Sequence, residues 1–272
     1  MLTILHGSDL HFGKHFDPEA ARAFRQAVDA QAPDLLVLSG DFTQRAKVRE
    51  YREARAFLDD LPALPLVMTP GNHDVPLYRF WERVLAPRKN YLAFISPELD
   101  TVLRIPGATV VALDSTAPLR AIVNGRLLDR QLQFAARAFR EGPEADLKVL
   151  VTHHNLAPAP DQGPVQFLPG YQECLRAFAE MGVELILGGH LHRAFSASSL
   201  DWVDGGEELV MAYSGTTASG RGRARERGKN SFNVIRVNPH LLEVTHFLRT
   251  PGEDVFSPFG TRSFPRRAEG SS

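Results

Sequence analysis

The fold is decided by the stretch Leu2-Thr-Ile-Leu-His-Gly-Ser-Asp-Leu-His11, in which a short apolar run passes directly into Asp9-Leu-His11. Residues 2–5 have the continuous apolar character of a strand that is buried on both faces. The next elements are expected at residues 18–32 (helix), 35–38 (strand), 48–58 (helix) and 64–68 (strand). This alternation predicts an α/β protein whose parallel strands are covered by helices.

After residue 100 the alternation of strands and helices becomes less regular, and from residue 195 to residue 247 the expected elements are mostly strands. Strands are expected at residues 102–105, 110–113, 147–152, 185–187, 195–202, 209–213, 232–237 and 241–247, with helices at 127–140 and 171–181. So many strands predict two sheets packed face to face with helices outside, rather than one open sheet. The rhythm stops near Arg249, so we expect one domain over residues 1–249 and a flexible tail, rich in Pro, Gly, Ser and Arg, over residues 250–272.

Five of the expected strands end in polar clusters made of metal-ligand residue types. The clusters are Asp9-Leu-His11, Gly40-Asp41, Gly71-Asn72-His73-Asp74, His153-His154 and Gly188-Gly189-His190-Leu-His192. Any one of them is easily explained as an ordinary turn or solvated loop, but five in order, each at a strand end, are not. Sites in open α/β sheets form outside the carboxyl ends of the strands, so these loops can converge.

The residue types in these loops favour a site for two metal ions. Seven ligands are expected: Asp9, His11, Asp41, Asn72, His153, His190 and His192. Seven are too many for one tetrahedral ion, but they serve two ions with four contacts each if one carboxylate bridges. Oxygen and imidazole ligands without thiolates suit manganese, which we expect, and also iron, zinc, nickel or cobalt.

The ordered set of motifs resembles the calcineurin-like metallophosphoesterases over about two thirds of the chain. The resemblance implies a four-layer α/β/β/α sandwich, with two mixed sheets and the metals at the carboxyl ends of the strands. It assigns the first ion to Asp9, His11, Asp41 and His192, and the second to Asp41, Asn72, His153 and His190. His154 is the alternative to His153. One departure is Gln44, which stands where many members carry Asp or Asn, and we expect it to support the ligands at most.

Within the family, Ser8-Asp-Leu-His11, Ser39-Gly-Asp-Phe-Thr43 and Glu50-Tyr51 resemble bacterial cyclic-nucleotide phosphodiesterases. The resemblance implies in-line attack on phosphorus by a metal-bridging hydroxide. His73 is the candidate general acid or transition-state stabiliser, with Asp74 orienting it. A DNA-repair-type nuclease acting on DNA or RNA, a phosphomonoesterase and a non-enzymatic scaffold are the alternatives.

The remaining features restrict the setting of this chemistry. The formal net charge of -1 gives no overall attraction to nucleic acid or anionic membranes, and no apolar run is long enough to span a membrane. The single cysteine, Cys174, cannot form an internal disulfide, so we expect a buried structural thiol and a cytoplasmic location.

The segment 221–229 carries five cations and one anion; it is either a mobile solvated loop or a flap that faces phosphate or nucleic acid. The oligomeric state cannot be inferred.

Overall fold

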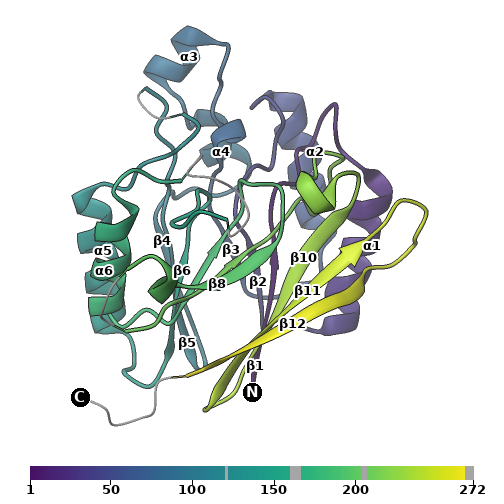
Figure 1. Ribbon diagram of the computed structural model, residues 1–272. Coiled ribbons are helices and arrows are strands. Elements are labelled where there is room, and N and C mark those ends of the chain that lie inside the picture. The colour runs from purple at the N-terminus through teal and green to yellow at the C-terminus, as the bar shows by residue number, and fades with distance from the viewer. Residues whose placement is uncertain (120–121, 160–166, 204–206, 267–272) are drawn as a thin grey trace.

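The protein forms two six-stranded sheets packed face to face in a computed structural model that describes residues 1–119, 122–159, 167–203 and 207–266 (Figure 1). The first sheet has the order β12-β11-β10-β1-β2-β3 and the second has the order β4-β5-β6-β7-β9-β8. The first contains β1 (Leu2–Gly7), β2 (Leu35–Leu38), β3 (Leu66–Met68), β10 (Asn230–Val237), β11 (Leu241–Arg249) and β12 (Ser257–Pro265). The second contains β4 (Thr101–Ile105), β5 (Ala108–Ala112), β6 (Leu147–Val151), β7 (Leu185–Gly188), β8 (Phe195–Ser198) and β9 (Val210–Tyr213).

Helices cover the outer face of each sheet. Helices α1 (Pro18–Gln31) and α2 (Val48–Asp59) cover the first sheet, and α5 (Asp129–Glu141) and α6 (Tyr171–Glu180) cover the second. Helix α4 (Lys89–Phe94) packs against α2, and α3 (Phe80–Leu85) has no buried residue. Figure 1 shows α1 and α2 on one side of the molecule and α5 and α6 on the other, with the sheets between them. The four-layer α/β/β/α sandwich expected from the sequence is therefore confirmed.

The alternation of side chains along each strand separates three apolar layers. Ile4 lies between the two sheets, whereas the next residue, Leu5, packs under the helices of the first sheet. In the second sheet Val149 and Val151 point to the layer between the sheets, and Leu150 points to α5 and α6. Strands buried on both faces must be apolar at successive positions, which is why they read as continuous apolar runs.

Both sheets are mixed, and their parallel parts set the position of the site. Strands β1, β2 and β3 run parallel to one another, as do β5, β6, β7 and β9. The remaining strands are antiparallel to their neighbours. In the first sheet β10 pairs with β1 in this way, and at the edges of the second sheet β4 pairs with β5 and β8 pairs with β9. Parallel neighbours end on the same side of a sheet, so the loops after β1, β2 and β3 meet at one end of the molecule.

The structure differs from the expected elements in three places. Residues 257–265, expected to lie in a flexible tail, form β12, which pairs with β11. Nearly all side chains of β12 except Phe264 are exposed, so this edge strand has no apolar alternation that a sequence could reveal. Helices α3 and α4, six residues each, were not expected. The strand expected over residues 195–202 ends at Ser198, where a 3₁₀ turn, Ser199–Asp201, follows.

Two other expectations bear on the chemistry. Cys174 is buried in α6, and burial raises the pKa of its thiol to about 11, as expected for a structural cysteine. In the described parts of the chain, none of the helices has both the length and the apolar character that crossing a membrane requires. The last residues of the expected tail, 267–272, lie outside the described residues.

Candidate metal centre

The loops after β1 and β2 are held together by backbone hydrogen bonds that continue the parallel pairing of the strands. Asp9 donates its N–H to the carbonyl of Gly40 at 3.0 Å, and His11 donates to the carbonyl of Asp41 at 2.9 Å. In the second sheet, Gly189 donates to the carbonyl of His153 at 3.0 Å. The expected ligand residues of neighbouring strands are thus fixed relative to one another by the main chain.

Five of the seven expected ligands have left-handed backbone conformations. The φ angles are 56° at Asp9, 50° at His11, 55° at Asp41, 72° at His190 and 57° at His192. Positive φ is unfavourable for residues other than glycine and collects at functional sites, where the surroundings enforce it. At residues 190–192 it curls the loop, so that two alternate histidines face the same centre, as the sequence required.

Gly40 shows why a glycine precedes Asp41. Its φ is +98°, and a Cβ at this position would lie 2.7 Å from Nδ1 of His153 and 2.8 Å from the backbone nitrogen of Gly71. Only glycine lets the loops after β2, β3 and β6 approach this closely. The Gly-Asp motif is therefore a packing requirement of the centre.

One group of four side-chain atoms has the spacing of a tetrahedral metal site. The carboxylates of Asp9 and Asp41 and the imidazoles of His11 and His192 each contribute one atom, all within 4.8 Å of one another. His11 Nε2 lies 3.4 Å from Asp9 Oδ1, 3.6 Å from Asp41 Oδ2 and 3.2 Å from His192 Nε2. Bonds of about 2.1 Å to a tetrahedral ion would separate the ligand atoms by about 3.4 Å. The chain thus brings together the four residues expected for the first ion.

A second group shares the same oxygen of Asp41. His153 Nε2 lies 3.5 Å from Asp41 Oδ2 and 3.2 Å from Asn72 Oδ1, and His190 Nδ1 lies 2.9 Å from Asn72 Oδ1. These separations again correspond to neighbouring ligands of one ion. Asp41 Oδ2 belongs to both groups, the position that a bridging carboxylate requires.

The carboxylates of Asp9 and Asp41 each use one oxygen for a backbone hydrogen bond and leave the other oxygen available to bind a metal ion. Asp9 Oδ2 accepts the N–H of His190 at 3.0 Å, and Asp41 Oδ1 accepts the N–H of His73 at 2.8 Å. The other oxygens, Asp9 Oδ1 and Asp41 Oδ2, are buried without a hydrogen-bond partner among the described residues. Buried carboxylate oxygens without a partner are costly, and a cation satisfies them, so the donor set fits two metal ions.

The pKa values of the carboxyl groups of Asp9 and Asp41 reflect their burial and the groups packed around them. Burial raises the pKa of Asp41 well above its usual value, and repulsion from Asp9 and Asp74 adds to this effect. Burial also acts to raise the pKa of Asp9, but contacts with His11 and His192 outweigh it and hold that pKa low. Cations at the centre would favour the charged form of both groups.

Hydrogen bonds from Nδ1 leave two of the imidazoles ready to bind metal through Nε2. His153 Nδ1 lies 2.8 Å from the carbonyl of Ser39, and His192 Nδ1 lies 3.1 Å from the carbonyl of Arg221. A carbonyl only accepts, so Nδ1 carries the hydrogen and Nε2 presents its lone pair. His154, the alternative ligand, also has a bonded Nδ1, 2.8 Å from Oγ of Ser115, but the Nε2 atom that lies 3.5 Å from Asp41 Oδ2 belongs to His153.

His73 lies beside the first group without being part of it. Its ring packs edge-on against His11 with the centroids 4.9 Å apart, and its Nδ1 donates to the carbonyl of Gln44 at 2.8 Å. Nη1 of Arg221 lies 3.1 Å from Nε2 and 3.5 Å from Nδ1 of the same ring. Burial, and next the charge of Arg221, lower the pKa of His73 to about 3.

The carboxylate of Asp74, expected to orient His73, bonds to other groups among the described residues. It accepts from the N–H groups of Phe42, Thr43 and Gly71 at 2.9–3.1 Å. These bonds tie the loop after β2 to the loop after β3. The ring of His73 is oriented instead by Gln44, the residue that departs from the family pattern.

Two residues of the site were not identified from the sequence. Gln44 accepts from Arg221 through Oε1 at 3.2 Å, and its backbone carbonyl holds His73. The only signal for Gln44 was its departure from the usual Asp or Asn. Arg221 was noted merely as one cation of an arginine-rich segment, and nothing in that segment indicates which arginine faces the metals.

Comparison with known proteins agrees with this geometry. The family model described as calcineurin-like phosphoesterase matches residues 2–194. A protein named "probable cyclic nucleotide phosphodiesterase" from Synechococcus sp. is 31% identical over 208 residues, which cover 71% of this chain and 74% of that protein. The cAMP/cGMP dual specificity phosphodiesterase of Mycobacterium tuberculosis is 27% identical over 77% of this chain, and the match spans 64% of the length of that relative.

Solved structures show the same fold at low sequence identity. A purple acid phosphatase from yellow lupin seeds superimposes with a TM-score of 0.71 at 9% identity, over 97% of this chain and 54% of that one. A dimetal phosphatase from Danio rerio gives a TM-score of 0.69 at 11% identity, over 97% of this chain and 98% of that one. At such identities the likeness concerns the fold alone.

Proposed function

The chain belongs to the calcineurin-like phosphoesterase family, and from this premise we propose that it is a phosphodiesterase that uses two metal ions. The observation that carries the proposal is the position of Asp41 Oδ2, which lies 3.6 Å from Nε2 of His11 in the first group and 3.5 Å from Nε2 of His153 in the second. The first ion is assigned to Asp9, His11, Asp41 and His192, and the second to Asp41, Asn72, His153 and His190. Manganese is the metal we propose to test first, because oxygen and imidazole ligands without thiolates suit it.

The metals would supply the chemistry common to such centres. When bound, a pair of cations polarises a phosphoryl oxygen and lowers the pKa of a coordinated water. The protein contributes the positions of its ligands, which the backbone bonds between the loops and the hydrogen bonds at Nδ1 of His153 and His192 fix in advance. Such preorganisation removes the cost of rearranging ligands during the reaction.

His73 is assigned a place beside the leaving group. Its Nδ1 hydrogen is held by the carbonyl of Gln44, and Nη1 of Arg221 lies 3.1 Å from its Nε2. In the neutral ring Nε2 carries only a lone pair, so the neutral ring cannot donate a hydrogen bond through it to a phosphoryl or leaving oxygen. It becomes a general acid only when Nε2 takes up a proton.

Cyclic nucleotides are the substrate class we propose to test first. Two of the relatives named above are described as phosphodiesterases of cyclic nucleotides. Of the aromatic residues that flank the motifs, Phe12 and Phe42 are buried, whereas Tyr78 is 72% exposed. The guanidinium of Arg45 lies over one face of the Tyr78 ring, 4.6 Å from its centre, and holds this exposed ring next to the loop of Gln44, where its other face would stack on a base.

A nuclease is the second candidate, and one observation favours it. Arg223 is exposed two positions after Arg221, so positive charge extends from the metal centre to the surface. A nuclease would bind a longer backbone along these arginines and would lose affinity steeply with added salt. A small cyclic diester would show a much weaker salt dependence.

The test compares bis-p-nitrophenyl phosphate with p-nitrophenyl phosphate on protein that has been stripped of metal and refilled with manganese. Cleavage of the diester that depends on metal and is lost in Asp41→Asn supports the proposal. Cyclic AMP, cyclic GMP and single-stranded DNA at two salt concentrations then separate the two candidates. Preference for the monoester would make the protein a phosphatase. Failure to cleave either compound with both metals bound would refute a general phosphodiesterase.

A further inference from the structure

Arg221 brings a guanidinium group into the metal centre from a distant part of the chain. Its Nη1 lies 3.1 Å from Nε2 of His73 and 3.2 Å from Oε1 of Gln44, although 148 and 177 positions separate these residues in sequence. Arg221 is half-buried, whereas Arg223, Arg225 and Arg227 of the same segment are exposed. One arginine of this cationic segment therefore has a different environment from its neighbours.

The backbone around Arg221 is hydrogen-bonded to His192, one of the expected metal ligands. The carbonyl of Arg221 accepts from Nδ1 of His192 at 3.1 Å, and the N–H of Arg223 donates to the carbonyl of His192 at 2.9 Å. Further along, the carboxylate of Glu226 accepts from the N–H of Ala194 at 2.5 Å and from Oγ of Ser231 at 2.6 Å. These contacts make the segment a fixed support rather than the mobile solvated loop that was one reading of the sequence.

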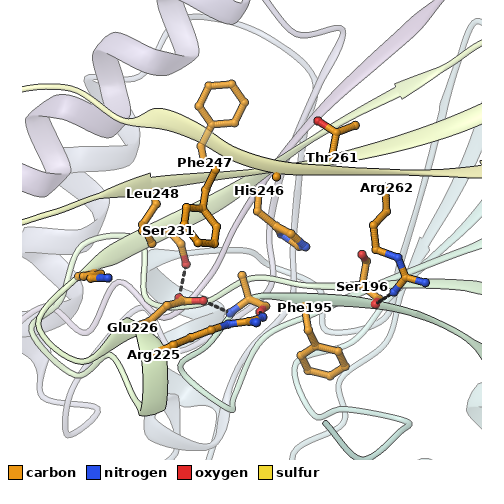
Figure 2. A pocket seen from close by; sticks show the side chains of 14 residues that line it. Phe195, Ser196, Arg225, Glu226, Ser231, His246, Phe247, Leu248, Thr261 and Arg262 are labelled. Atoms are coloured by element: carbon orange, nitrogen blue, oxygen red, sulfur yellow. Dashed lines mark hydrogen bonds between the residues drawn. The ribbon is translucent and has the colours of Figure 1, made fainter. Parts of the chain in front are cut away.

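A separate cavity lies on the other side of this support. It has a volume of 380 Å³ and is lined by Phe195, Arg225, Glu226, His246 and Arg262, among others, and by none of the expected metal ligands (Figure 2). Figure 2 shows the two hydrogen bonds of Glu226 at its wall. Glu226 and Arg225 thus lie on the cavity side of the segment, whereas Arg221 reaches the metal side.

The acceptors of Arg221 in this arrangement are both neutral. Nδ1 of His73 must carry its hydrogen because it lies 2.8 Å from a carbonyl, so the ring beside Arg221 is a neutral imidazole, with Nη1 of Arg221 3.1 Å from Nε2 and 3.5 Å from Nδ1. Among the described residues, no carboxylate is hydrogen-bonded to this guanidinium; its side-chain acceptors are the Gln44 amide oxygen and the His73 ring. An anionic phosphate oxygen is a stronger acceptor than either of these groups.

The identity of residue 44 fits this arrangement. An aspartate or glutamate that reached Arg221 would form an ion pair with it and hold the guanidinium against the protein. The amide of Gln44 instead orients Arg221 through one hydrogen bond without neutralising it. The presence of Gln44, where many family members carry Asp or Asn, and its hydrogen bond with Arg221 therefore belong to a single local arrangement.

We propose that Arg221 is the phosphate-binding arginine of the metal centre. It exchanges its contact with the neutral His73 ring for an anionic oxygen of the phosphoryl group. The inference rests on the proposed function in that it places the phosphoryl group at this centre. It does not depend on whether the substrate is a cyclic nucleotide, another diester or a monoester.

Inorganic phosphate is the probe for this proposal. Its dissociation constant is measured by calorimetry on manganese-loaded wild type, Arg221→Ala, Arg221→Lys and Arg227→Ala, with metal content measured on each sample. Arg227→Ala removes the same charge from the same segment at an exposed position. We expect Arg221→Ala to weaken phosphate binding about 10-fold to 100-fold, the usual worth of a hydrogen bond between charged groups. Arg221→Lys should lie between Arg221→Ala and wild type, because it keeps the charge but loses the planar fork.

Kinetics on bis-p-nitrophenyl phosphate give a second readout. We expect Arg221→Ala to raise KM and lower kcat while metal content stays at the wild-type level, and Arg227→Ala to match wild type. Equal phosphate affinity in Arg221→Ala and Arg227→Ala would overturn the proposal. Loss of metal in Arg221→Ala would also overturn it and make the side chain structural. Phosphate binding that depends on Arg221 in a protein that cleaves no diester would refute the proposed function and leave this inference standing.

Discussion

His11 and His192 face each other across the two sheets with their Nε2 atoms 3.2 Å apart. His11 follows β1 of the first sheet and His192 follows β7 of the second. Nδ1 of His192 donates to a carbonyl, and burial holds the pKa of His11 well below its usual value. Two imidazole nitrogens at this distance, beside the unpartnered Oδ1 of Asp9, form a centre that a cation would stabilise.

Removal of metal should therefore destabilise the protein. At a free manganese concentration of 100 times the dissociation constant, binding adds about 2.7 kcal/mol to the free energy of unfolding. For a chain of this length we expect a rise in Tm on the order of 5–10 °C over chelator-treated protein. Thermal melts across a manganese titration measure it. A Tm that does not change while metal analysis shows two bound ions would contradict the assignment.

Asp41→Asn should affect both metal positions, because Asp41 Oδ2 belongs to both groups of ligand atoms. Metal analysis should find the content of this variant reduced well below one ion per chain. Asp9→Asn is the matched comparison, since Asp9 belongs to the first group alone, and it should retain about one ion. Equal losses in the two variants would show that Asp41 does not bridge.

The adjacent histidines 153 and 154 should differ in their effect on metal binding. His153→Ala removes an Nε2 atom that lies 3.2 Å from Asn72 Oδ1, so the second ion should be lost or bound at least about 10-fold more weakly. His154→Ala removes a ring that contacts Ser115, so metal content should stay near two per chain. Measuring the metal content of both variants after dialysis decides between them. The reverse result would make His154 the ligand.

His73→Ala should lower kcat while the metal content stays near that of wild type. The ring contacts His11, Gln44 and Arg221, and it supplies no atom to either group of ligands. A positioned proton donor or hydrogen-bonding group of this kind contributes about 10²–10⁴-fold. Steady-state kinetics on bis-p-nitrophenyl phosphate with parallel metal analysis measure the effect. If the variant loses metal, His73 is a ligand or a structural residue.

His246 should make the protein sensitive to acid. Burial, followed by the charges of Arg225 and Arg262, lowers the pKa of His246 to about 4. The unfolded state, with a pKa near 6.5, binds this proton first, so stability is complete above about pH 6.5 and falls as the pH drops toward 4. The contribution is on the order of 3 kcal/mol at most.

Replacement of His246 by glutamine tests this sensitivity. His246→Gln should lose less stability than wild type between pH 6.5 and 4 in denaturant titrations on metal-free protein. The exposed His240 provides the control, and His240→Gln should follow wild type. Identical pH profiles for wild type and His246→Gln would show that His246 is not the residue responsible.

The strands that support the centre could be predicted because they are buried on both faces. Residues 35–38 and 147–151 are entirely or almost entirely apolar, and each is followed within a few positions by Asp41 or His153. The abrupt change from apolar to ligand-type residues marks the carboxyl end of a strand. Strand β12 gave no such signal, because an exposed edge strand has no buried face to reveal a period.

The contacts around His73 could not be predicted because they depend on loop paths. Arg221 reaches His73 only since its own backbone is bound to His192, and no spacing in the sequence records that contact. The curl at residues 190–192 was required by the two histidines, whereas the positive φ at Asp9 and Asp41 was not foreseen. Residue types predict which groups gather, but the tertiary contacts decide how each is oriented.

The distribution of the ligands between the two sheets has a mechanical consequence. Asp9, His11, Asp41 and Asn72 follow strands of the first sheet, and His153, His190 and His192 follow strands of the second. Two bound ions would therefore act as a cross-link that clamps the halves of the sandwich at one end. The sheets could not separate there until metal leaves, so the lifetime of the folded, loaded protein would be set by the rate of metal release rather than by the apolar core alone.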